Sequence, residues 1–131
     1  MAQSLITDEG KTEVLRLAFK NDTDHGAFNF MALGGNSSSG YQDGNFNEVT
    51  DTSYHREETD VTLLDDKQIQ ISATFDETNL NISDGEIIKE IGLVNSLEYS
   101  SEEIFFAYCE VPKIEKNDVI SLKYTVVIEI E

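Results

Sequence analysis

The sequence predicts a mainly β protein, an antiparallel β-sandwich with one short N-terminal helix. Two segments, residues 68–75 and 119–131, alternate apolar and polar side chains, which is typical of strands with one buried face. One segment near the N-terminus has the start signals and the apolar side of a helix. At least six strand candidates separated by polar turns favour two packed sheets. A chain of 131 residues fits a single domain, expected over residues 1–131.

The helix is expected at about residues 8–20. Thr7 can act as the N-cap, and Asp8 and Glu9 place negative charge in the first turn, where the helix dipole favours it. The apolar side is formed by Val14, Leu15, Leu17 and Ala18. The helix is expected to end in residues 21–26, because the short polar side chains there compete with helical hydrogen bonding and Gly26 turns freely.

The expected strands are short apolar or alternating runs bounded by turn residues, and they cover residues 28–33, 55–64, 68–75, 87–94, 104–111 and 119–131. Residues 34–53 are expected to form an exposed loop, because too few of them are apolar to offset the entropy of ordering. The short link at residues 65–67 predicts a hairpin. Gly92 suggests a bulge or a close backbone approach. The strand at 104–111 should be central and should close at Pro112, which cannot donate to a ladder.

Charge is the strongest signal in the composition. The chain has 26 acidic and 9 basic residues, a formal net charge of −17 that is spread evenly along it. Such a surface repels phosphates, so we expect neither nucleic acid nor an anionic membrane surface as a partner. No apolar run approaches the ~18 residues needed to span a bilayer, and no secretory leader is expected. The single cysteine excludes an intrachain disulfide.

Signals for catalysis, metals and cofactors are weak. Cys109 is either a nucleophile or a small buried side chain, and the second is favoured because it lies mid-strand, far in sequence from both histidines. His25 and His55 with Cys109 are too few for a closed zinc site. Residues 43–48 and 21–24 have oxygen-rich spacing, but neither completes a calcium loop. We therefore expect no catalytic, metal or cofactor site, and a small hydrolase is the least favoured alternative.

Several short motifs occur in a characteristic order. Residues 90–95 read Glu-Ile-Gly-Leu-Val-Asn, followed by an apolar strand that ends near Pro112, a lysine with a polar turn, and a long closing strand. Near the start, residues 5–10 lead into the helix, and residues 30–37 run from an apolar strand into a small-residue turn. In this order the chain resembles the small tail-associated structural proteins of tailed bacteriophages, of the tail-collar or fibre-attachment type. The resemblance covers nearly the whole chain except residues 38–54.

The resemblance implies a virion component of the tail region, assembled in the host cytoplasm, whose partners are other virion proteins of the tail, collar, baseplate or fibre. It implies no catalytic residues. We expect a stand-alone fibre-attachment adaptor or decoration subunit. The alternative is a receptor- or glycan-binding module of a tail fibre. Its contacts would come from the loop residues Tyr41, Asp43, Phe46 and Tyr54, because aromatic faces with carboxylates suit polyols.

Two surfaces are candidates for assembly. The last strand offers an apolar face and backbone edge groups, which favours a ring or fibre-type homo-oligomer, with an internal core strand as the alternative. An acidic protein should attach to its neighbours through its least acidic part. Lys11, Arg16 and Lys20 place three of the nine cations on the helix, which makes the helix the candidate attachment surface. The alternative is that these are ordinary solvated helix charges.

Overall fold

A computed structural model describes residues 4–20, 26–35, 56–65, 67–75, 87–96, 103–115 and 121–129 of the chain. Among these residues the chain forms one helix and eight strands. In chain order they are β1 (Ser4–Ile6), α1 (Asp8–Phe19), β2 (Phe30–Gly34), β3 (Glu57–Glu58), β4 (Asp60–Asp65), β5 (Gln68–Phe75), β6 (Ile87–Val94), β7 (Phe105–Glu115) and β8 (Leu122–Glu129). The predicted fold class is confirmed: the protein is mainly β, with two antiparallel sheets and a short N-terminal helix.

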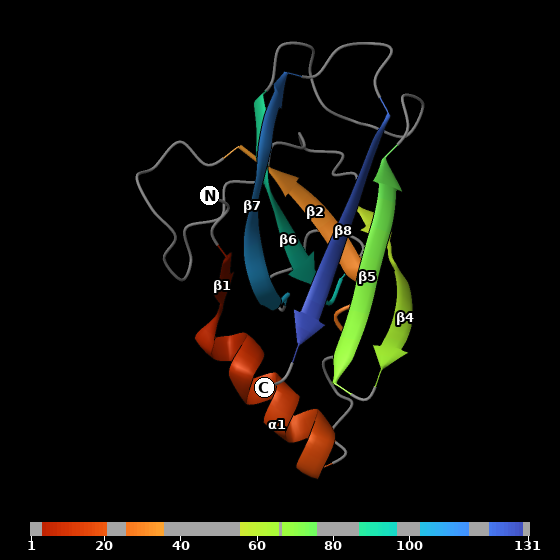
Figure 1. The fold of residues 1–131 in the computed structure, drawn as a ribbon. Coiled ribbons are helices and arrows are strands. Elements are labelled where there is room, and N and C mark those ends of the chain that lie inside the picture. The colour runs from red at the N-terminus through yellow and green to blue at the C-terminus, as the bar shows by residue number, and fades with distance from the viewer. Residues whose placement is uncertain are drawn as a thin grey trace.

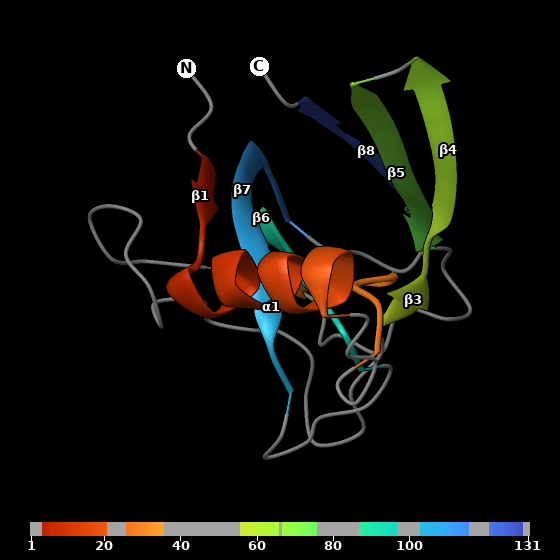
Figure 2. The ribbon, with the colours of Figure 1, turned by 90° about the horizontal axis from the view of Figure 1, so that it is seen from below.

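The two sheets differ in width. Sheet A has five strands in the order β1-β7-β6-β2-β3, and sheet B has three in the order β4-β5-β8. Figure 1 shows sheet B as a layer in front of β6 and β2, while β1 and β7 lie to one side of it. Figure 2, seen from below, shows β4, β5 and β8 of sheet B apart from β1, β7 and β6 of sheet A. The helix α1 lies across the end of the molecule in this view. Sheet B therefore covers part of sheet A and leaves β1 and β7 beside it.

The core lies between the sheets and follows the alternation of the strands. Its buried members come from β2, β5, β6 and β8 and are Met31, Leu33, Ile71, Ala73, Phe75, Ile88, Ile91, Leu93 and Leu122. The period-two pattern predicted for residues 68–75 is confirmed, because Ile71, Ala73 and Phe75 all face this core. Burial of such side chains contributes about 1.5–3 kcal/mol each and supplies most of the driving force for folding.

Several strand predictions are confirmed. Residues 68–75 and 87–94 are strands with the predicted bounds, and β7 is central, paired with β1 and β6. The hairpin at residues 65–67 is present: β4 pairs with β5, and the Lys67 N–H donates to Asp65 Oδ1 at 2.9 Å. The helix has its N-cap at Thr7 and ends one residue earlier than predicted, with Lys20 as the C-cap.

Three boundaries were predicted wrongly. The strand predicted for residues 55–64 is two strands, split at Thr59, whose N–H and hydroxyl both donate to the Asn29 carbonyl at 2.9 Å as the chain crosses between the sheets. The loop does not begin at Gly34, which is buried in β2. β7 does not close at Pro112. This residue lies in a register shift opposite Ile88–Glu90, where a missing N–H breaks no regular ladder, and it is exposed.

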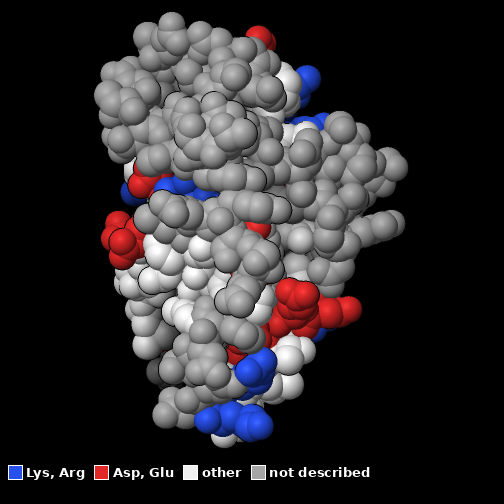
Figure 3. Space-filling view, turned by 180° about the vertical axis from the view of Figure 1, so that it is seen from behind, with Lys and Arg blue, Asp and Glu red and all other residues white. Residues whose placement is uncertain are grey.

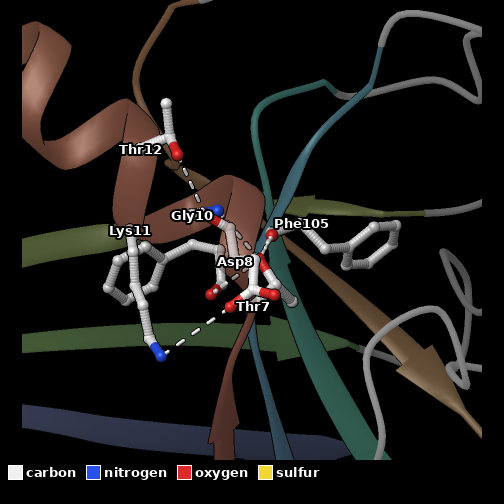
Figure 4. Close-up of polar contacts among 7 residues, drawn as sticks. Thr7, Asp8, Gly10, Lys11, Thr12 and Phe105 are labelled. Carbon is white, nitrogen blue, oxygen red and sulfur yellow. Dashed lines mark hydrogen bonds and ion pairs between the residues drawn. The ribbon is translucent and has the colours of Figure 1, made fainter.

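The N-terminus of α1 is attached to β7 through Thr7 and Gly10 (Figure 4). The Thr7 hydroxyl accepts from the Gly10 N–H at 2.9 Å and donates to the Phe105 carbonyl, while the Thr7 N–H donates to the Phe106 carbonyl at 2.9 Å. Gly10 is buried against the backbone of Phe106, and a Cβ at this position would lie 2.6 Å from the Phe106 oxygen. We call this contact the Thr7–Gly10 clasp.

Replacing a helical glycine by alanine usually raises the free energy of unfolding, but the clasp predicts that it falls for Gly10. Gly10→Ala should lower the free energy of unfolding by about 1–3 kcal/mol, because overpacking against a backbone outweighs the ~1 kcal/mol that alanine gains in helix propensity. Chemical denaturation measures the change. Thr12→Ala, at an exposed position of the same helix, is the control and should leave stability unchanged or slightly higher. A Gly10→Ala protein as stable as the control would contradict the clasp.

Candidate functional site

The core is incompletely covered along β7 and β8. Seven apolar residues pack against the core while remaining half-exposed, and all of them lie on these two strands: Phe106, Cys109, Val111, Ile114, Tyr124, Val126 and Ile128. Figure 1 shows β7 to one side of sheet B, so these residues belong to the two strands at this margin of the sandwich. We call this strip the open side. Partial exposure of so many core-facing side chains on one flank makes it a candidate surface for a partner.

The open side ends in a cleft of about 540 Å³ beneath α1. Helix, sheet A and sheet B all contribute to its walls, which are formed by Ile6, Lys11, Val14, Leu15, Phe28, Ile69, Ile71, Leu93, Phe106, Ile128 and Glu129. Nine of these eleven residues are apolar, and Lys11 and Glu129 supply the charged groups. A volume of this size is typical of protein sites that receive a ligand or an anchoring side chain. We call it the α1 cleft.

Exposed apolar side chains continue the α1 cleft onto the surface. Val14, Leu15 and Phe19 of α1 are 44%, 59% and 81% exposed. The helix buries Gly10 and Glu13 instead, because the Thr7–Gly10 clasp turns that face toward β7. The apolar side predicted for the helix is therefore not buried in the core as a whole. Much of it faces the α1 cleft or solvent.

The structure places the three predicted attachment cations on α1 but gives them different surroundings. Lys11 is exposed at the α1 cleft, 3.9 Å from the exposed Asp8 carboxylate, and such a surface pair contributes little to stability. Arg16 is half-buried, with Nη1 3.4 Å from Oε1 of the buried Glu13. Lys20 is exposed at the C-cap. Figure 3 shows basic side chains gathered at the end of the molecule that carries α1.

The N-terminal segment that carries α1 is less acidic than the whole chain, which has a net charge of −17. Residues 4–20, which include α1, have three of each sign and are neutral overall. The helix region therefore has the charge balance expected of an attachment surface on an acidic protein.

Arg56 is a buried residue that the sequence interpretation missed. Its side chain is fully buried, with Nη1 2.6 Å from Glu103 Oε2 and donating to the Ser96 carbonyl at 3.1 Å, and its guanidinium lies 5.5 Å from the Phe105 ring centroid. These contacts tie the start of β3 to the end of β6 and the start of β7. A buried pair of this kind is structural: removing one partner typically costs 3–5 kcal/mol.

Most of the other predicted site residues lie outside the part of the chain that the structure describes. Tyr41, Asp43, Phe46 and Tyr54 lie outside the described residues, as do His25, His55 and the acidic segments 21–24 and 43–48. Within the described residues, no group of three His, Cys, Asp or Glu side chains could hold a metal ion. No helix in that part of the chain is both long and apolar enough to cross a membrane.

Two ionisable groups on the open side are affected by burial. Desolvation raises the pKa of the Cys109 thiol, and it also raises the pKa of the Tyr124 hydroxyl. The Tyr124 oxygen is buried without a hydrogen-bond partner among the described residues. A raised thiol pKa lowers the thiolate fraction at neutral pH, so Cys109 fits the structural interpretation better than the nucleophilic one.

These shifts predict a loss of stability in alkali. A folded-state pKa above the unfolded one stabilises the protein below the unfolded pKa, and this contribution disappears as the pH rises, because the unfolded chain ionises first. Wild type should therefore lose more stability than Tyr124→Phe between about pH 8 and pH 10.5. Urea denaturation at both pH values measures the difference. Equal losses in the two proteins would show that Tyr124 is not desolvated.

Comparison with known proteins adds no further constraint: no family model, no curated protein and no solved structure matches the chain significantly. The likeness to phage tail proteins consequently depends on the motifs in the sequence alone.

Proposed function

We propose that the protein is a non-catalytic structural component of a bacteriophage tail, collar or baseplate, acting as a fibre-attachment adaptor or decoration subunit. The observation that carries the proposal is the α1 cleft, an open apolar space of about 540 Å³ beside exposed apolar helix residues. Apolar surface of this kind marks an interaction site. The motifs around residues 5–10 and 90–95 supply the phage context.

The charge distribution supports attachment through this end of the molecule. A chain of net charge −17 meets repulsion from other acidic proteins, but residues 4–20 are neutral overall and carry the basic side chains of α1. Apolar contact in the α1 cleft can therefore form without bringing uncompensated like charges together. Arg16 is less suited to direct recognition, since it is engaged with Glu13.

Homo-oligomer formation belongs to the same proposal, as an alternative to a different partner at the same strand edge. The terminal strand β8 lies at the edge of sheet B, where, among the described residues, it pairs with β5 alone. Edge strands present unpaired backbone groups that other chains can use. The glycan-binding alternative depends on loop residues outside the described part of the chain and stays a prediction.

The proposal is tested with particles of the phage that encodes the chain. Leu15→Lys should reduce occupancy of the protein in purified particles at least tenfold, because it places a charge in the α1 cleft. Leu15 is 59% exposed, so the fold should survive, as thermal denaturation can verify. Quantitative mass spectrometry of the particles measures occupancy. Absence of the wild-type protein from particles would contradict the virion assignment itself.

A matched control separates the cleft from the charge change. Thr12→Lys adds the same charge at an exposed helix position outside the cleft lining, and it should leave occupancy unchanged. If both variants, or neither, reduce occupancy while remaining folded, attachment does not depend on the α1 cleft.

A further inference from the structure

The edge strand β8 has the properties of a template for another strand. It pairs with β5 over all eight residues from Leu122 to Glu129 in continuous register, and within the described chain nothing pairs with its other edge. Such an edge exposes a row of N–H and C=O groups. Because no proline, glycine or register shift interrupts β8, an added strand could pair along its full length.

Sheet A has a surface on β7 that a strand added next to β8 would cover. Phe106, Val111 and Ile114 of β7 face the core but are half-exposed, because sheet B has three strands over the five of sheet A. Strands in a sheet lie about 4.8 Å apart, and packed sheets lie about 10 Å apart. A fourth strand beside β8 would therefore extend sheet B over the uncovered face of β7.

The α1 cleft continues this space. Ile128 and Glu129, at the end of β8, line the cleft together with Phe106 of β7. A strand that follows β8 would thus begin or end in the cleft, beside Val14 and Leu15 of α1. The backbone groups of β8 favour an extended occupant over a helix or a small apolar molecule, because neither of these can continue the ladder.

The side chains of β8 define the chemistry of the partner. Tyr124, Val126 and Ile128 face inward and require apolar residues at alternate positions opposite them. On the outer face, Lys123 and Glu129 are exposed near opposite ends of the strand. An antiparallel partner would complement them with a basic residue opposite Glu129 and an acidic residue opposite Lys123.

The opposite edge of sheet B is a poorer template. β4 has a register shift between Leu63 and Asp65, and acidic residues occupy both of its ends, at Asp60 and Asp65. Bulges and charges of this kind are the usual means by which edge strands resist pairing.

We infer that the open side binds an extended segment of a partner protein as a fourth strand of sheet B, antiparallel to β8. The segment alternates apolar and polar residues, starts with a basic residue opposite Glu129 at the end of β8 next to the α1 cleft, and ends with an acidic residue opposite Lys123. The inference rests on the proposed role in attachment and adds how the partner is held, but it does not depend on the place of the protein in a particle.

The probe is a synthetic fluorescein-labelled peptide, KVTVTVE, compared with EVTVTVE, which reverses the charge opposite Glu129. Fluorescence anisotropy with the full chain should show saturable binding, with KVTVTVE about threefold tighter, the value expected for one cross-strand charge pair. The exposed-site variant Glu129→Lys should reverse the preference. Asp60→Lys on β4 is the matched control and should leave the preference as in wild type.

Three results would overturn the inference: no saturable binding at millimolar peptide, a preference that Glu129→Lys leaves unchanged, or a reversal caused by Asp60→Lys, which would place the strand on β4. The outcome is independent of the particle experiment. Reduced occupancy of Leu15→Lys without peptide binding would keep the attachment proposal and reject strand addition. Peptide binding together with full occupancy of Leu15→Lys would keep strand addition and reject attachment through the α1 cleft.

Discussion

The position of α1 depends on one side chain, Thr7. Its hydroxyl caps the helix and bonds to β7, so the same oxygen determines where the helix starts and where it is attached. Gly10 allows this close approach because a Cβ would collide with the Phe106 backbone. With its N-terminus fixed in this way, the helix spans the end of the sandwich, and the α1 cleft forms beneath it. The proposed attachment surface therefore depends on a local contact.

The unequal sheets explain why the surface is apolar. A three-stranded sheet cannot cover a five-stranded one, so residues of β7 and β8 with the sequence pattern of core residues remain half-exposed. Single apolar residues on a surface need no explanation, but a continuous strip beside a cleft does. An unfilled strand position accounts for the strip, the cleft and the continuous edge of β8 together.

Local patterns in the sequence predicted the elements better than their bounds. The cap at Thr7 and the alternation at residues 68–75 depend on near neighbours and were confirmed. β1 is three residues long, too short to show a period, and is defined by pairing with β7. The passage of β7 through Pro112 and the pairing of Arg56 with Glu103 depend on residues distant in sequence. The α1 cleft could not be predicted either, because its walls come from α1 and five strands that are far apart in the sequence.

Among the described residues β8 has a free outer edge, and hydrogen exchange of the free protein tests this openness most directly. Alternate amides of an edge strand point away from its neighbour. In amide exchange followed by NMR, residues 122–129 should alternate between slow and fast exchange, while the amides of residues 68–72 of β5, which pair with both β4 and β8, should be uniformly slow. Uniformly slow exchange along β8 would show that its edge is already covered and would contradict the account.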